Sequence, residues 1–120
     1  MSFPVAFSVE VVPARAGIVC VALAGELDVA AYPHAMEAVA LVTRHRDTEL
    51  VVLDLRGLTF IDSSGLRLVL EAQAEARRDG FQFAAVPGPP EIQRVFGLAC
   101  VLDEVTWTDA GVVVAMADAV

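Results

Sequence analysis

The fold of this chain is decided by one stretch, VVLDL at residues 51–55 followed by FIDSSGL at residues 60–66. A short apolar run rich in Val and Leu is typical of a strand that is covered on both faces. Helical spacing of the apolar residues begins directly after the serines. Ser63 and Ser64 therefore fall where a buried strand meets the N-terminus of a predicted helix.

The position of the two serines allows two interpretations. Backbone N–H groups at a helix N-terminus have no partner inside the helix, and the macrodipole is positive there, so a serine hydroxyl can cap the helix. The same positive end tolerates a phosphate on the serine. From spacing alone, capping is the simpler interpretation, and the phosphoacceptor interpretation stays open.

The sequence before this stretch predicts a hairpin and a helix. In residues 7–12, one face has Phe7, Val9 and Val11 and the other has Ser8, Glu10 and Val12, as in a strand with one face partly exposed to water. Residues 18–24 read as a second, more apolar strand, and the turn at 13–17 joins the two as an antiparallel hairpin. The run GELD at 25–28 ends this strand, and Pro33 fits the first turn of the following helix.

The helix after the serines is predicted to run to about Asp79. Gly80 is expected to end it as a left-handed C-terminal cap. Its spacing places Leu66, Val69 and Leu70 in the core.

The last third of the chain predicts a strand and two helices. The strand covers 81–86, and the Gly-Pro-Pro run at 88–90 separates it from a short helix that Gly97 is expected to end. A capped helix start at Thr108 predicts a last helix toward residue 120. The whole order predicts an α/β single domain over residues 1–120, with a mixed four- to five-stranded sheet packed with about four helices.

The charge of the chain narrows the classes of partner. The formal net charge is −8, with eight arginines and no lysine. Such an acidic surface repels nucleic acid and anionic lipid, because affinity for both depends on clustered Lys and Arg. The lack of lysine also excludes Schiff-base and P-loop chemistry. We expect no direct nucleic-acid contact and a protein partner with a basic face.

The sequence also indicates where in the cell the protein acts and whether it binds a metal or cofactor. The longest apolar stretches, 16–25 and 110–117, fall well short of the roughly 20 residues of a membrane-spanning helix. The N-terminal residues do not have the pattern of a secretion signal, so we expect a cytoplasmic protein without membrane insertion. Cys20 and Cys100 lie in apolar segments without C-x-x-C or clustered His, which predicts two buried free thiols, no metal site and no cofactor.

Two motifs resemble the STAS domain family, most closely the bacterial anti-sigma factor antagonists. The first is GELD at 25–28, which closes the second strand and leads to the first helix. The second is LDL at 53–55 together with FIDSSGL at 60–66. The resemblance covers nearly the whole chain and implies a STAS-like fold.

The resemblance implies a role in transcription regulation. In this family the antagonist, which is not an enzyme, binds an anti-sigma factor that is also a serine kinase, and so frees the sigma factor. The kinase phosphorylates a serine of the Asp-Ser-Ser-Gly motif, which ends the association, and a metal-dependent serine phosphatase restores it. The second serine of the pair is the usual acceptor, so the resemblance implies Ser64 here, with Ser63 as its structural partner and the less favoured acceptor.

The predicted partner-binding surface consists of Asp28, Asp62, Ser63, Ser64, Arg67 and Glu71. Asp62 can hold the turn by a hydrogen bond or orient the acceptor hydroxyl, and Asp28 can cap the loop before the first helix or contact the partner. Tyr32 stands where relatives often have a small or hydroxylated residue, and His34 follows Pro33. Both residues are candidates for tuning partner choice, or ordinary surface side chains.

Two other functions compete with this one. A serine at a strand-to-helix turn is also typical of a hydrolase, but Ile61 and Asp62 stand where G-x-S-x-G requires glycine. His34 and His45 also precede the serines, whereas that fold places its histidine last. The second competing function requires the same fold: the chain would be a STAS scaffold or transporter-accessory subunit that does not act on a sigma factor. The intact serine motif favours the phosphorylation switch over this function.

Overall fold

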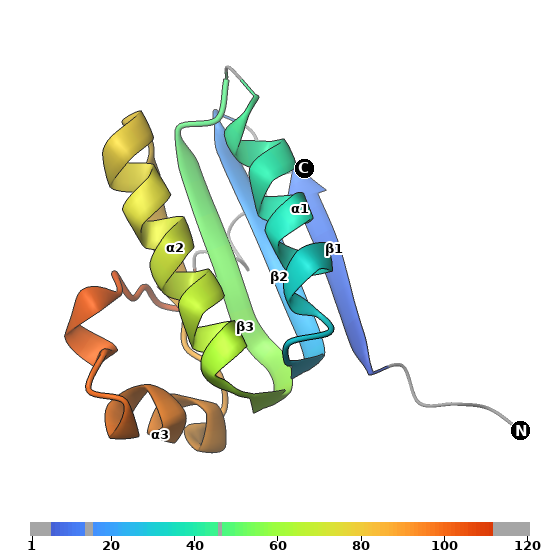
Figure 1. Cartoon of the computed structure of the whole chain (residues 1–120). Helices are drawn as coiled ribbons and strands as arrows, with labels where there is room; N and C mark the ends of the chain where they lie inside the picture. Colours follow the sequence, from blue (N-terminus) through green and yellow to red (C-terminus); the bar gives the residue numbers. More distant parts are fainter. Residues whose placement is uncertain (1–5, 14–15, 46, 112–120) are drawn as a thin grey trace, which may run out of the picture.

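The computed structural model describes residues 6–13, 16–45 and 47–111. The strands in chain order are β1 (Phe7–Pro13), β2 (Ile18–Leu27), β3 (Leu50–Ile61) and β4 (Gln82–Val86). The α-helices are α1 (Tyr32–Thr43), α2 (Ser63–Asp79) and α3 (Pro90–Leu98), followed by a 3₁₀ turn at Leu102–Glu104. The predicted α/β class is confirmed (Figure 1).

The four strands form one mixed sheet in the order β1-β2-β3-β4. Strand β1 pairs antiparallel with β2, which confirms the predicted hairpin, and β3 runs parallel to both β2 and β4. Strand β3 has 12 residues and extends well beyond the buried run at 51–55. Its second half continues the pairing with β2, through two register shifts, up to Leu27 opposite Ile61.

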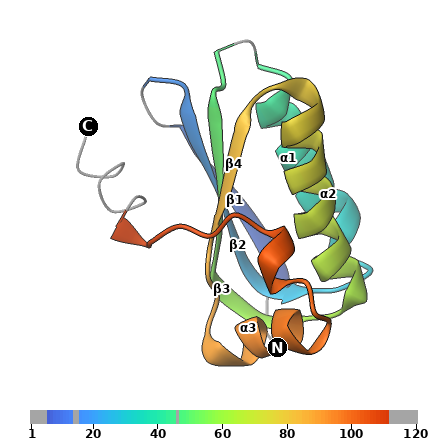
Figure 2. The ribbon, with the colours of Figure 1, turned by 90° about the vertical axis from the view of Figure 1, so that its left-hand side faces the viewer.

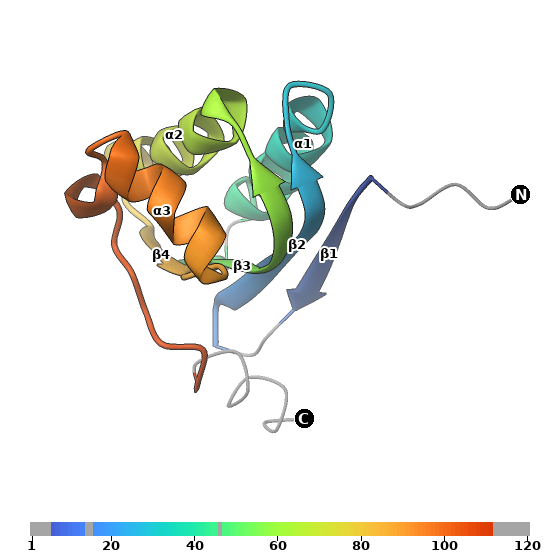
Figure 3. The ribbon, with the colours of Figure 1, turned by 90° about the horizontal axis from the view of Figure 1, so that it is seen from below.

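Helices α1 and α2 lie side by side on one face of the sheet, and the core fills the space between the layers (Figures 1 and 2). Helix α3 lies at the edge of the sheet where β3 meets α2 (Figure 3). The buried stripe of α2 is centred on positions 65, 69, 72 and 76, which follow helical spacing. Leu66, Leu68 and Val69 are buried within or beside this stripe.

The core prediction for α2 is confirmed for Leu66 and Val69 and is wrong for Leu70. Leu70 is only partly buried, because it lies beyond the edge of the stripe. Leu68 is fully buried instead, on the opposite flank.

Two glycines are predicted to end helices, and the structure confirms the prediction for one of them. Gly80 has a φ of 81° and its N–H donates to the Ala76 carbonyl, so the left-handed cap of α2 is confirmed. Gly97 does not end α3, which continues to Leu98, and the left-handed residue beyond it is Cys100 with a φ of 59°.

The cysteine prediction is correct for Cys20 and wrong for Cys100. Burial, above all, raises the pKa of the Cys20 thiol to about 11, so this thiol is not a nucleophile at neutral pH. Cys100 is exposed, because it lies in the left-handed turn after α3 rather than in a continuous apolar segment.

The structure describes three α-helices, one fewer than the four or so expected. Most of the fourth predicted helix falls on residues 112–120, which lie outside the described residues. No helix in the described ranges has the length and apolar character needed to cross a membrane.

Candidate functional site

The two sequence motifs meet at one edge of the sheet. Because β2 and β3 are parallel, their carboxyl ends lie at the same edge, and Leu27 pairs with Ile61 there (Figure 1). The N–H of Asp62 donates to the Leu27 carbonyl at 3.3 Å. The loop that begins at Asp28 and the start of α2 therefore leave the sheet from neighbouring positions.

Asp62 is the residue that caps α2. Its backbone is extended, and its Oδ1 accepts hydrogen bonds from the N–H groups of Ser64 at 2.9 Å and Gly65 at 3.2 Å. A cap of this kind contributes about 1 kcal/mol to stability. The interpretation of a serine as the capping residue is therefore wrong, because the carboxylate one position earlier already holds these amides.

Ser63 and Ser64 are the first two residues of α2. Ser63 is exposed and Ser64 is half-buried. Their hydroxyls are not used for the cap, and they lie at the positive end of the helix dipole. This is a position at which a hydroxyl can be modified without loss of the helix start.

Gly65 holds the serine pair close to the sheet. A Cβ at this position would lie 2.5 Å from Ile61 Cγ1 and 2.8 Å from the Leu27 carbonyl oxygen. Only glycine lets α2 begin this close to the end of β2. The glycine of the FIDSSGL run therefore fixes the distance between the two motifs.

Asp28 shapes the loop before α1. Its Oδ1 accepts a hydrogen bond from the N–H of Ala31 at 3.0 Å, and its carbonyl accepts one from the N–H of Tyr32. The capping role expected for Asp28 is therefore present. Its contact with a partner stays a prediction.

Tyr32, Arg67 and Glu71 form a cluster that joins α1 to α2, called here the Tyr32–Arg67–Glu71 cluster. The Tyr32 hydroxyl donates to Glu71 Oε2, and this hydrogen bond raises the pKa of Tyr32 above its usual value. Arg67 Nε lies 3.4 Å from Glu71 Oε1, and the guanidinium carbon lies 4.7 Å from the centre of the Tyr32 ring. The i,i+4 spacing predicts the Arg67–Glu71 pair, but no local pattern places a tyrosine of α1 against it.

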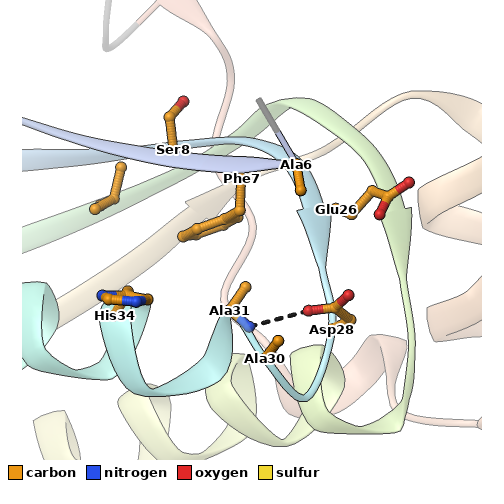
Figure 4. Close-up of a pocket in the computed structure, with 9 residues that line it drawn as sticks. Ala6, Phe7, Ser8, Glu26, Asp28, Ala30, Ala31 and His34 are labelled. Carbon is orange, nitrogen blue, oxygen red and sulfur yellow. Dashed lines mark hydrogen bonds between the residues drawn. The ribbon is translucent and has the colours of Figure 1, made fainter. Parts of the chain in front are cut away.

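A cavity of about 450 Å³ lies beside Asp28, between the start of β1 and the start of α1 (Figure 4). The Phe7 ring and the exposed His34 imidazole line it, and the Asp28 side chain closes one end (Figure 4). Glu26 adds a second carboxylate to the wall. No local sequence pattern indicates this cavity, because it depends on the long-range placement of β1 next to α1.

The described residues contain no group of three or more His, Cys, Asp or Glu side chains suited to a metal ion. The site consists of the exposed Ser63, the half-buried Ser64, a capping carboxylate and the Tyr32–Arg67–Glu71 cluster. These groups can present a hydroxyl to a second protein.

The family of the chain follows from a match over most of its length. The family model described as the STAS domain matches residues 11–115. The chain belongs to the STAS domain family.

Solved structures of other proteins have the same STAS fold. An anti-sigma factor antagonist from Mycobacterium paratuberculosis is 24% identical, with a TM-score of 0.76 and coverage of 97% of this chain and 98% of that chain. The anti-sigma factor antagonist SpoIIAA in its unphosphorylated form is 18% identical, with a TM-score of 0.73 and coverage of 94% and 98%. The Bacillus protein SpoIIAA in the phosphorylated form is also 18% identical, with a TM-score of 0.68 and coverage of 90% and 97%.

A STAS fold within a larger protein is also similar. The murine anion transporter Slc26a9 is 16% identical, with a TM-score of 0.67 and coverage of 78% of this chain. The match covers 16% of the transporter chain. The fold therefore occurs both as nearly the whole of a small protein and as a small part of an anion transporter.

Proposed function

We propose that this STAS chain is an anti-sigma factor antagonist, one domain over residues 1–120, that binds an anti-sigma factor with serine kinase activity and thereby releases a sigma factor. Phosphorylation of Ser64 by that kinase ends the binding, and a serine phosphatase restores it. The chain acts as a binding partner and kinase substrate rather than as an enzyme. Its place of action is the cytoplasm.

The observation that carries this proposal is the placement of Ser64. The hydroxyl lies at the N-terminus of α2, on the edge shared by the two motifs, and Asp62 rather than a serine caps the helix. A kinase can therefore modify Ser64 without breaking the helix start. The similarity to SpoIIAA, which has been solved in unphosphorylated and phosphorylated forms, supports the same proposal.

The proposed partner-binding surface surrounds this edge. It comprises the predicted residues Asp28, Asp62, Ser63, Ser64, Arg67 and Glu71. Two apolar side chains add to it, since Val29 follows Asp28 and is 70% exposed, and Phe60 pairs with Glu26 at the end of β3 and is 47% exposed. Exposed apolar residues among charged ones are typical of a protein–protein interface. The net charge of −8 favours a partner with a basic face.

The experiment that tests the proposal is an affinity capture from the source cell with two baits, Ser64→Ala and Ser64→Asp. We expect a protein with an ATP-binding serine kinase domain to be strongly enriched on the Ala bait and depleted on the Asp bait. The Asp bait introduces a negative charge where the partner meets a neutral hydroxyl. A matched Ser8→Asp bait, changed at an exposed position of β1, should capture as much kinase as the parent.

The second candidate function is that of a scaffold or transporter-accessory STAS domain. The similarity to the STAS fold of the anion transporter Slc26a9 supports it. Capture of transporter subunits in place of a kinase, equally by the Ala and Asp baits, would favour this function and contradict the first.

A further inference from the structure

The start of α2 contains one basic side chain, and that side chain stands beside the serine pair. Arg67 is the only Lys or Arg among residues 62–76. It follows Ser64 by three positions and Ser63 by four, and residues at these spacings are neighbours on a helix. In the structure Arg67 reaches forward along the helix to Glu71, and rotation of its long side chain back toward the helix N-terminus brings it to the serines.

We propose that Arg67 binds the phosphoryl group on Ser64, and that it leaves the Tyr32–Arg67–Glu71 cluster to do so. The inference rests on the proposed phosphorylation of Ser64 and names the group of this chain that responds to it. When Ser64 is phosphorylated, the phosphate is then bound by an arginine of the same chain.

The helix N-terminus by itself offers the phosphate few donors. The N–H groups of Ser64 and Gly65 already donate to the Asp62 carboxylate, and that of Leu66 donates to the Asp62 carbonyl. The amide of Ser63 is the one left over in the described first turn of α2. The Asp62 carboxylate also repels a phosphate. A phosphate on Ser64 therefore needs a cation nearby, and Arg67 supplies it.

Arg67 is held loosely enough to move. Its side chain is 59% exposed, and it is held by one contact with Glu71 at 3.4 Å and by the face of the Tyr32 ring. A phosphate carries about −1.5 to −2 charges and three acceptor oxygens, against one charge on Glu71. The planar guanidinium can also bind phosphate through two parallel hydrogen bonds. Glu71 keeps the Tyr32 hydroxyl as a hydrogen-bond partner when Arg67 leaves.

The proposal gives phosphorylation a second effect on the partner-binding surface. The phosphate adds negative charge at Ser64 and at the same time neutralises the positive charge of Arg67. It also leaves Glu71 without its basic neighbour. A partner that had met an arginine beside a hydroxyl then meets a net negative surface.

The test uses the full chain with phosphoserine inserted at position 64 during synthesis, so that no kinase is needed. A ³¹P NMR titration measures the midpoint of the second phosphate ionisation. An adjacent cation favours the dianion, so the midpoint should lie about half a pH unit higher in Arg67→Gln than in the parent. The carboxylates of the proposed partner-binding surface, Asp28, Asp62 and Glu71, are the same in both proteins.

Two control variants remove other arginines. Arg77→Gln alters the far end of α2, about 15 Å along the axis from position 67. Arg94→Gln alters α3, which lies at the same edge of the sheet as the start of α2 (Figure 3). Both should leave the midpoint unchanged. Equal midpoints in the parent and Arg67→Gln, or a larger change in Arg94→Gln, would overturn the proposal.

A second measurement follows Tyr32, which is the only tyrosine of the chain. With ¹³C-labelled tyrosine, the ring signals should shift when position 64 changes from serine to phosphoserine, because the guanidinium leaves the ring face. The same change in an Arg67→Gln background should leave them in place. Unshifted Tyr32 signals in the parent would show that Arg67 stays in the cluster. Since these results involve no kinase, they are independent of the bait experiment, which tests the proposed function.

Discussion

Replacing Ser64 with Asp is expected to weaken binding to the proposed anti-sigma factor partner about a hundredfold or more, while the domain stays folded. In the complex, the side chain at position 64 loses water and faces whatever group of the partner had met the hydroxyl. If that group is a carboxylate about 5 Å away, at an effective dielectric constant near 20, repulsion is on the order of 3 kcal/mol per unit charge. A loss of this size corresponds to about a hundredfold in the dissociation constant.

The fold should survive the same change. Position 64 is the second residue of α2, and a carboxylate in the first turn of a helix gains about 0.3–1 kcal/mol from the helix dipole. The nearby Asp62 carboxylate reduces this gain but does not depend on the Ser64 hydroxyl, since it binds backbone amides.

Calorimetric titration against the purified anti-sigma factor measures the effect on affinity. Ser64→Ala is the matched control. It should bind as tightly as the unphosphorylated parent, and it should keep this affinity when ATP is present, whereas the parent loses it. Equal affinities for the Asp and Ala variants would contradict the proposed control by charge at this position. Chemical denaturation of both variants separates a loss of affinity from a loss of folding.

The second large effect is expected for Leu68→Ala, which should lower the free energy of unfolding by about 2–5 kcal/mol. Leu68 is fully buried between α2 and the sheet, and truncation leaves a cavity that the surrounding core fills only in part. Guanidinium unfolding measures the difference. The matched control is Leu70→Ala on the same helix, and it should cost clearly less because Leu70 is only partly buried. A larger loss for Leu70 than for Leu68 would show that α2 is rotated relative to the sheet.

The Leu68 and Leu70 pair shows what spacing alone can predict. The apolar periodicity of α2 correctly gives a helix with one buried face, because any amphipathic helix must cover its apolar stripe. It does not give the centre of that stripe, which depends on how closely α2 approaches β2. The close approach at Gly65 sets this geometry, and it involves Leu27, which lies far away in the sequence.

At the serine pair, too, the local sequence predicts the position of the residues but not the contacts that they make. Its position between a strand and a helix follows from local sequence, and the structure has it there. Which residue caps the helix depends on backbone dihedral angles, and the extended conformation of Asp62 makes it the cap in place of a serine. The contact of Tyr32 with Arg67 and Glu71 lies between two helices, and no pattern within either helix predicts it.

The cap at Asp62 and the cluster at Arg67 suggest a division of roles at the edge of the sheet. Asp62 and Gly65 hold the backbone around Ser64, and neither needs the hydroxyl. The exposed residues Ser63, Val29 and Phe60 can then meet the partner. A phosphate changes the charge of this edge and leaves its backbone in place.

The central claim is that Ser64 is the residue a partner kinase phosphorylates. The most direct measurement is incubation of the parent chain with the captured kinase and ATP, followed by intact mass and peptide mass spectrometry. We predict the addition of one phosphate, located on Ser64, no addition to Ser64→Ala, and full labelling of Ser63→Ala. Labelling on Ser63 with none on Ser64, or no transfer of phosphate from the captured kinase, would contradict the account.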